Sequence, residues 1–315
     1  MVNAEDEYSQ SRFVIDQIKN LQHQGIALNE IAVLFRASFH SFDLEIELSR
    51  EGIAFVKMGG FKFVESAHIK DVLAHMRVMA NVYDRISWYR ILLLIEKIGP
   101  KSAQKIFETI IKEKSGYTGL LSAGIDRIKG LDRLMDLFST LDAHPMSIAE
   151  IGKTIIDYYL PILKETYDDH PRRARDLEHL TEIMDRYKSL DQFLTDMALE
   201  PPNVSFENSL YNSDSTPDRL ILSTIHSAKG LEWHTVFVIW ALDGRFPSVH
   251  ILHKEEELEE ELRLMYVAAT RAKEKLFFTY PGNVYDRSTG LILNRPSRYL
   301  DGITDDILEK KYEYR

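Results

Sequence analysis

The stretch LSTIHSAKGLEW at residues 222–233 decides how this sequence folds. It begins as an apolar strand and runs into a loop that carries a hydroxyl, an imidazole and an ammonium group on Thr224, His226 and Lys229. Gly230 lets the backbone turn closely within this loop. Donors of this kind at the end of a strand can hold phosphate oxygens. Each residue alone would fit a solvated loop, but the complete string favours a binding site.

Apolar runs on both sides of this stretch predict the other strands of a parallel sheet. The predicted strands are residues 31–35 (IAVLF), 53–57, 219–224, 236–240 and 276–280, and the predicted helices beside them are residues 12–24, 42–50 and 258–272. The first and last parts of the chain therefore both alternate predicted strands with predicted helices, which is typical of an α/β domain.

The middle of the chain has a different sequence pattern, because its apolar residues recur at the helical period of 3.6 residues. The predicted helices are residues 72–80, 87–95, 102–112, 125–141, 148–160 and 177–199, and residues 201–217 are polar and rich in turn formers, which predicts a linker. We expect one α/β domain, residues 1–71 and 211–315, interrupted by an all-helical insertion, residues 72–210.

Composition excludes several classes of protein. Lys and Arg total 39 against 49 Asp and Glu, and the resulting net charge of −10 argues against a protein that simply coats a polyanion. The absence of cysteine excludes disulfides, cysteine-ligated metals and thiol nucleophiles. The eleven histidines show no metal-ligand spacing, so we expect no metal site. No apolar stretch is long enough to span a bilayer, and the acidic N-terminus lacks a signal peptide, which favours a cytoplasmic protein.

Two arginines are candidates for binding a phosphate. Arg36 directly follows the strand at residues 31–35, at the edge where α/β sheets bind ligands. Arg271 lies near the end of a helix predicted over residues 259–272 (EEELRLMYVAATRA), where it could neutralise a γ-phosphate or, alternatively, interact with the helix dipole. The approximate apolar face of this helix consists of Leu262, Met265, Ala269 and Ala272. The glutamates at 255–261 are interpreted as a solvated helix face.

Two further motifs concern the helical part. IEKIGPKSAQKI at residues 95–106 is similar to a helix-hairpin-helix, in which backbone amides around Gly99 and the start of the second helix, with Lys101 and Ser102, would face a DNA phosphate. Lys97 replaces the usual first glycine, and a plain turn between two helices is the equal alternative. The GKT at residues 152–154 imitates the end of a P-loop but continues a helix, which cannot wrap phosphates.

Taken together, these motifs resemble the C-terminal lobe of UvrD/Rep/PcrA-type superfamily 1 DNA helicases. IAVLFR (31–36) resembles motif IV of that family, and GGFKFVESAHIKD (59–71) its exit from domain 2A. LSTIHSAKGLEW resembles motif V, and EEELRLMYVAATRA motif VI. The resemblance implies that the α/β domain is the RecA-like domain 2A and that the helical insertion is domain 2B.

The family's roles transfer to matching positions only. By resemblance, Arg36 and Arg271 would contact the γ-phosphate of ATP as catalytic arginines, and Glu232 would contact the ribose. Thr224, His226 and Lys229 would lie along single-stranded DNA, while the hairpin at Gly99 would touch the duplex of a fork.

The resemblance also implies that the N-terminal half of the ATPase is not part of this sequence. The chain has no P-loop, so an N-terminal RecA-like lobe would have to hold the phosphates and Mg²⁺, and Met1 marks a cut in a longer protein or the start of a split gene. We expect an ATP-dependent 3′–5′ DNA helicase or translocase of repair, replication or recombination, inactive as this piece alone. The alternative is a non-enzymatic DNA-binding or protein-docking module. A helicase–nuclease subunit would need a nuclease domain that this sequence lacks.

Overall fold

The computed structural model describes the chain except for residues 60–62, 114–129, 199–217, 287–289, 305 and 314–315. It divides into two compact units, residues 1–62 with 199–315 and residues 63–198, which we term the sheet unit and the helical unit. The predicted linker, the expected boundary at residue 210 and the first part of the helix predicted over residues 125–141 lie outside the described residues.

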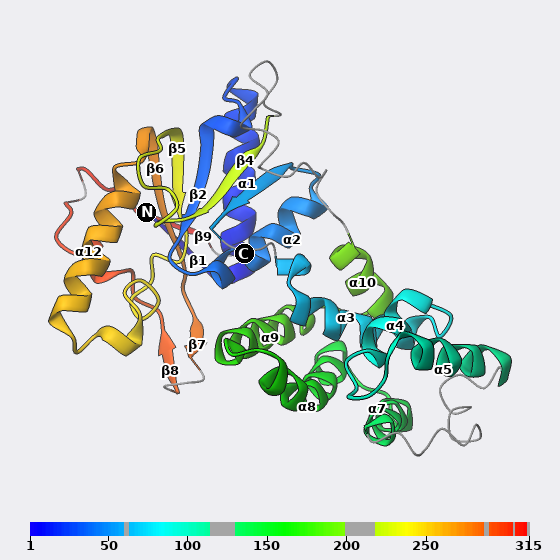
Figure 1. The fold of residues 1–315 in the computed structure, drawn as a ribbon. Helices are drawn as coiled ribbons and strands as arrows, with labels where there is room; N and C mark the ends of the chain where they lie inside the picture. Colours follow the sequence, from blue (N-terminus) through cyan, green and yellow to red (C-terminus); the bar gives the residue numbers. More distant parts are fainter. Residues whose placement is uncertain (60–62, 114–129, 199–217, 287–289, 305, 314–315) are drawn as a thin grey trace. The chain divides into compact units, whose positions relative to one another are not determined.

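The sheet unit is built on seven strands in the order β3-β4-β2-β5-β6-β1-β9 (Figure 1). Every neighbouring pair in this sheet is parallel. The strands are β1 (Val2–Ala4), β2 (Ile31–Phe35), β3 (Phe55–Met58), β4 (Leu220–Thr224), β5 (Trp233–Val238), β6 (Ala272–Pro281) and β9 (Lys311–Glu313), and a separate antiparallel hairpin consists of β7 (Val284–Asp286) and β8 (Leu291–Leu293). The predicted α/β fold with a parallel sheet is confirmed.

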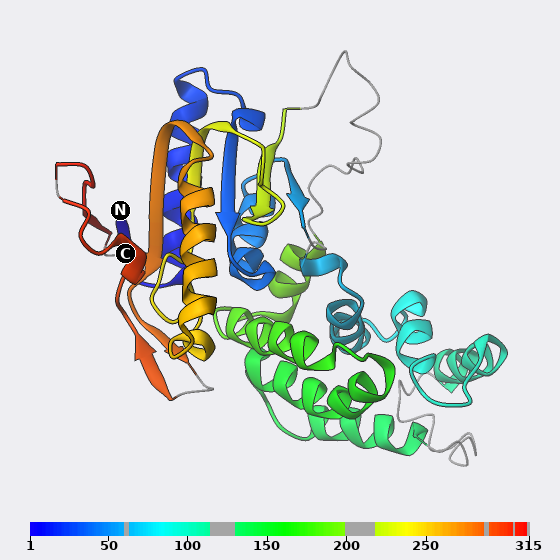
Figure 2. The ribbon, with the colours of Figure 1, turned by 60° about the vertical axis from the view of Figure 1, so that its left-hand side comes forward.

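Helices cover both faces of this sheet, which explains why all five residues of β2 are buried (Figure 2). Val33 and Phe35 pack with α1 (Glu7–His23) and α2 (Phe42–Arg50), whereas Ala32 and Leu34 pack with α12 (Glu255–Ala269). Successive side chains of a strand point to opposite faces, so one apolar run supplies two cores.

Strand and helix limits mostly follow the predictions, with differences that have local causes. The first helix begins at Glu7 rather than Arg12, because the side chain of Asp6 caps it by accepting a hydrogen bond from the backbone N–H of Ser9 (2.7 Å). The strand predicted over 236–240 begins at Trp233 and ends at Val238, and Trp240 beyond it adopts a positive φ of 55°.

The helical unit lies between β3 and β4 in the chain. Its described helices are α3 (Ala67–Ala80), α4 (Arg85–Leu92), α5 (Pro100–Glu113), α7 (Leu131–Ala143), α8 (Ile148–Thr166), α9 (His170–Met184) and α10 (Leu190–Ala198). The single helix predicted over 177–199 is wrong, because the chain leaves α9 and starts again as α10. The buried rings of Tyr187 and Phe193 meet edge-on across this break (5.1 Å) and favour the turn.

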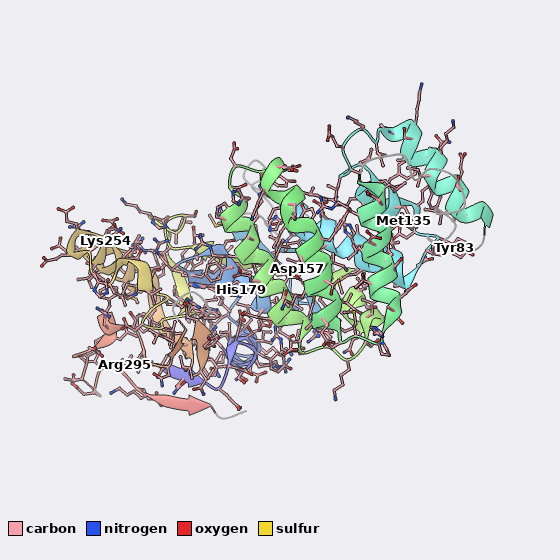
Figure 3. The ribbon with its side chains drawn as sticks, turned by 90° about the horizontal axis from the view of Figure 1, so that it is seen from below. Tyr83, Met135, Asp157, His179, Lys254 and Arg295 are labelled. Atoms are coloured by element: carbon pink, nitrogen blue, oxygen red, sulfur yellow. The ribbon has the colours of Figure 1, made fainter. Side chains whose placement is uncertain are left out.

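Buried polar groups help to fix the packing of the helical unit. Figure 3 shows this unit with its side chains, and the labels of Met135 and Asp157 locate α7 and α8. The carboxylate of Asp71 accepts hydrogen bonds from Arg90 Nε (2.6 Å) and from the hydroxyl of Tyr159 (2.5 Å). Burial, and then the charge of Asp71, raise the pKa of Tyr159 well above its ordinary value.

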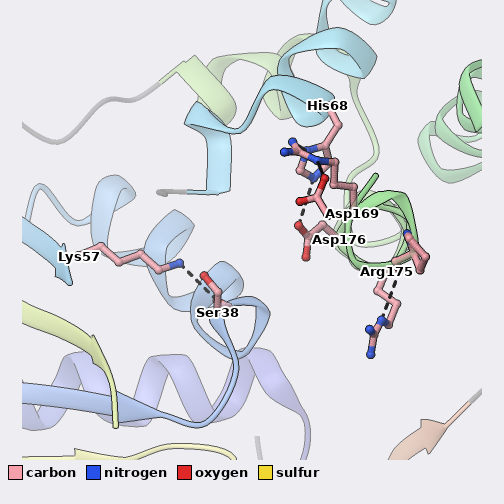
Figure 4. A network of polar contacts seen from close by, with 8 residues as sticks. Ser38, Lys57, His68, Asp169, Arg175 and Asp176 are labelled. Carbon is pink, nitrogen blue, oxygen red and sulfur yellow. Dashed lines mark hydrogen bonds and ion pairs between the residues drawn. The ribbon is translucent and has the colours of Figure 1, made fainter. Parts of the chain in front are cut away.

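A second polar group in the same unit centres on His68 (Figure 4). Its Nε2 contacts Asp176 Oδ2 and its Nδ1 contacts Arg173, both at 3.1 Å. These contacts join α3 to α9.

The fully buried side chain of His75 should make the free energy of unfolding depend on pH. Burial lowers the pKa of His75 from 6.5 to about 4, so the unfolded chain binds more protons than the folded one between these values. The free energy of unfolding should therefore fall by up to about 3 kcal/mol as pH drops from 7 to 4.

Urea unfolding at several pH values measures this contribution. His75→Phe should flatten the dependence, whereas His144→Phe, at an exposed position, should leave it unchanged. An equally steep dependence in His75→Phe would contradict the assignment.

Candidate functional site

Two predicted motifs meet at the carboxyl ends of adjacent strands. Phe35 at the end of β2 pairs with Thr224 at the end of β4, and the N–H of Ile225 donates to the carbonyl of Phe35 (3.1 Å). Arg36, the residue after Phe35, therefore lies at the same edge of the sheet as the loop that follows Thr224. Parallel pairing explains this, since it aligns the ends of strands that are far apart in sequence.

The segment after Arg36 is held by a buried ion pair. Lys57 on β3 binds Glu45 on α2 through Nζ and Oε1 (2.6 Å), and it also donates to the carbonyl of Ser38 (3.3 Å; Figure 4). The ammonium lies 5.0 Å from the ring centre of Phe42. A charge this deeply buried needs such partners, so β3 fixes the turn that follows Arg36.

Arg36 itself is paired with an acidic residue of α12. Its Nε donates to Oε1 of Glu261 at 2.6 Å. Glu261 is 5% exposed, so its interpretation as part of a solvated face is wrong. The preceding glutamates of the cluster, Glu255–Glu257, Glu259 and Glu260, are exposed as expected.

The buried face of α12 is turned by about one position from the predicted one. It consists of Glu261, Leu264, Met265 and Ala268, at steps of three and four residues. Leu262, which was predicted to face the core, is 49% exposed. The spacing of Glu261 from Leu264, Met265 and Ala268 was the sequence signal that could have revealed its burial.

Arg271 joins the segments that resemble motifs V and VI. It lies between α12 and β6, where its Nη1 donates to the carbonyl of Leu231 (2.9 Å) and its Nε to that of Val267 (3.0 Å). Its own carbonyl accepts from the N–H of Trp233 (2.9 Å). Glu232, between the two bonded neighbours, is exposed. The structure thus brings Arg271, a predicted phosphate-binding residue, to the backbone on both sides of Glu232, the predicted ribose-binding residue.

The guanidinium groups of Arg36 and Arg271 have different hydrogen-bond partners. Arg36 contacts α12 at Glu261, whereas Arg271 folds back onto the same helix at Val267. At about 1.5 Å of rise per residue, these two points of α12 are about 9 Å apart along its axis. Their joint contact with one phosphate stays a prediction, and it requires the side chain of Arg271 to leave its carbonyl partners.

The loop at residues 225–232 presents the predicted DNA-binding groups by burying their neighbours. Ile225 and Ala228 pack into the core, which leaves His226 and Lys229 exposed. Gly230 adopts a φ of +86°, as its expected role in the turn requires.

Ser227 and Gly59 belong to the same loop region, although sequence reasoning did not single them out there. The hydroxyl of Thr224 donates to that of Ser227 (3.0 Å). A Cβ on Gly59 would lie 2.3 Å from Ser227 Oγ and 2.5 Å from Thr224 Oγ1, and the φ of Gly59 is +78°. Only glycine fits there, so the loop and the end of β3 are in close contact.

The hairpin of the helical unit has an unexpected backbone. Between α4 and α5 the residue with a left-handed φ, +67°, is Lys97, the position where the helix-hairpin-helix pattern has glycine. Gly99 precedes α5 and its carbonyl accepts from the N–H of Ala103 (2.9 Å). Lys101 is exposed and Ser102 half-buried. Lys97 therefore adopts the left-handed conformation that the pattern assigns to a glycine, while a role of the hairpin in DNA contact stays a prediction.

The imitation P-loop is excluded, as predicted. Gly152, Lys153 and Thr154 lie within α8, which begins with a capping box between Ser147 and Glu150. Hydrogen bonds from Ser147 lower the pKa of the Glu150 carboxyl. Among the described residues no group of three histidines or acidic side chains could hold a metal ion, and none of the described helices is long and apolar enough to cross a membrane.

Comparison with known proteins identifies the family. Residues 1–283 match the model of the UvrD-like helicase C-terminal domain, and the chain belongs to this family. It is 32% identical, over 97% of its length, to a probable DNA helicase II homolog of Mycoplasma capricolum, and 29% identical over 98% to the ATP-dependent DNA helicase PcrA of Bacillus subtilis.

DNA helicase II of Escherichia coli is 28% identical over 98% of the chain. The chain spans less than half of these relatives, 44% of the first two and 45% of the third. It corresponds to the C-terminal portion of helicases of this type, as the resemblance of the motifs implied.

Replacing Lys97 by glycine tests the hairpin geometry. Glycine adopts a positive φ without the steric cost that a side chain imposes, so Lys97→Gly should raise the free energy of unfolding by about 1 kcal/mol. Thermal and urea unfolding measure the change, with Lys105→Gly as the control at an exposed position inside α5, where glycine should destabilise by about 1 kcal/mol. A destabilised Lys97→Gly variant would contradict the left-handed turn.

Proposed function

We propose that this chain is the 2A and 2B portion of an ATP-dependent DNA helicase that moves 3′ to 5′ on a single strand and acts in repair, replication or recombination. In this proposal the sheet unit is domain 2A and the helical unit is domain 2B. The observation that carries it is the junction at Arg271, where motif VI is bonded to Leu231 and Trp233 on both sides of Glu232.

The proposed reaction divides the work between two lobes. An N-terminal RecA-like lobe supplies the P-loop and most of the contacts to Mg²⁺, while this chain supplies the second wall of the ATP site. Arg36 and Arg271 neutralise charge that develops on the γ-phosphate, and Glu232 binds the ribose. The chain alone lacks the groups that orient a triphosphate and a water for in-line attack.

DNA is held by two separate parts of the chain in this proposal. Thr224, His226 and Lys229 contact the single strand, and the exposed loop that carries them lies at the carboxyl edge of β4. The hairpin around Gly99, Lys101 and Ser102 contacts the duplex of a fork. Support for the hairpin is its left-handed turn at Lys97.

An ATPase measurement tests the division of labour. The isolated chain should hydrolyse no ATP above background, and addition of a P-loop lobe should restore DNA-stimulated hydrolysis. Arg271→Ala should lower the kcat of this assembly by about 10³-fold or more, because a cation at the γ-phosphate is lost. Since Arg271 also donates to Leu231, unfolding of the variant is measured in parallel.

The outcomes separate the proposal from its alternative. Turnover by the isolated chain, or an unchanged kcat in folded Arg271→Ala, would contradict the assigned roles. DNA binding by the chain without any restored ATPase would instead favour the non-enzymatic DNA-binding module.

Salt-dependent DNA binding tests the loop at Lys229. Each phosphate contact of a single strand contributes about 0.7 to the slope of log affinity against log salt concentration. Lys229→Ala should therefore weaken binding to single-stranded DNA and reduce the slope by about 0.7. Lys153→Ala, an exposed lysine of α8, is the control and should change neither. Equal slopes in wild type and Lys229→Ala would remove Lys229 from the interface.

A further inference from the structure

We propose that Glu261 is a positioning residue that holds Arg36 in the orientation required to bind a phosphate. The inference rests on the proposed function, since it concerns the arginine assigned there to ATP. It adds a residue to which neither the motif comparison nor the composition gave a role.

The atom through which Glu261 binds is the first argument. A guanidinium has one Nε–H and two terminal amino groups that form a fork able to bind oxygens in pairs. Glu261 Oε1 accepts from Nε at 2.6 Å, and no hydrogen bond of Nη1 or Nη2 to the described residues accompanies it. Because the side chain of Arg36 is 35% exposed, the fork remains accessible while its stem is held.

The rigidity of Glu261 is the second argument. Its side chain is 6% exposed and leaves the buried face of α12 beside Leu264 and Met265. The same helix ends at the residues that precede Arg271. One rigid element therefore leads directly into one candidate arginine and orients the other, which limits how far either side chain can drift.

The charge of Glu261 is the third argument. One of its oxygens, Oε2, is buried with no hydrogen-bond partner in the described part of the chain, so Arg36 is the cation that compensates this carboxylate. The nearby Tyr299 donates its hydroxyl to the carbonyl of Leu258 (2.7 Å). Burial, followed by the charge of Glu261, raises the pKa of Tyr299 to about 12, so this neighbour stays neutral and adds no competing charge.

The test combines this chain with a P-loop lobe and measures DNA-stimulated ATP hydrolysis. Glu261→Ala removes the acceptor for Nε, and we expect kcat to fall by about 10²-fold with the KM for ATP within about twofold. Glu261→Gln keeps an acceptor oxygen and should retain most of the activity. In an Arg36→Ala background, Glu261→Ala should cause no further loss.

Matched controls distinguish positioning from a general effect on the helix. Glu260→Ala removes an exposed glutamate of α12 that binds Arg263, and it should leave kcat unchanged. An undiminished kcat in Glu261→Ala, or a further loss of similar size in the Arg36→Ala background, would overturn the proposal. If Glu261→Ala fails to fold, Glu261→Met, an apolar side chain of similar length without an acceptor, replaces it in the same double-variant comparison.

A measurement on the chain alone separates this inference from the proposed function. The Nε–H of Arg36, assigned in an NMR spectrum by its loss in Arg36→Lys, should exchange slowly with water in wild type and rapidly in Glu261→Ala, which removes the acceptor. Rapid exchange in wild type would overturn the positioning role whatever the ATPase result. Absence of hydrolysis in the wild-type assembly, together with slow exchange, would reject the proposed function instead.

Discussion

The parallel pairing of β2 with both β4 and β5 is the constraint on which the rest of the structure depends. β2 is apolar on both faces, so it is stable only when strands flank it and helices cover it. Its two partners follow the helical unit in the chain. That pairing places Arg36 beside the Thr224 loop, and α12, packed across the same strands, brings Glu261 to Arg36. The candidate site is thus a product of sheet register.

Most of the longer strands were accessible to sequence reasoning because their apolar runs are short and distinct, whereas their order in the sheet was not predicted. Residues 31–35 gave the limits of β2 without error, and the α/β fold with a parallel sheet followed from the alternation of elements. The short strands β1 and β9 were not anticipated, since three residues carry too little periodicity to detect. The break between α9 and α10 was missed for another reason, because no glycine or proline marks it.

Sequence reasoning identified the motifs that meet at the candidate site but not the partners of their side chains. The strings around Glu232 and Arg271 indicated their chemistry, and their backbone contacts agree with a shared site. The partner of Arg36 was not found, because Glu261 is 225 positions away and lies among five exposed glutamates of the same cluster. Its helical spacing from Leu264, Met265 and Ala268 distinguishes it from them, but the predicted face of this helix was placed one position away. The left-handed turn at Lys97 was likewise invisible, since nothing in its residue type demands a positive φ.

The place of the helical unit between β3 and β4 has a consequence for the nascent chain. As the chain leaves the ribosome, β2 emerges with both hydrogen-bonding edges unoccupied, and neither partner strand exists yet. At about 5–20 residues per second of synthesis, the roughly 200 residues up to the end of β5 take about 10–40 s. During that interval IAVLF is an open, uncharged strand of the kind that aggregates. We expect early docking of α1 and α2 on one face of β2 to protect it until β4 and β5 are synthesised.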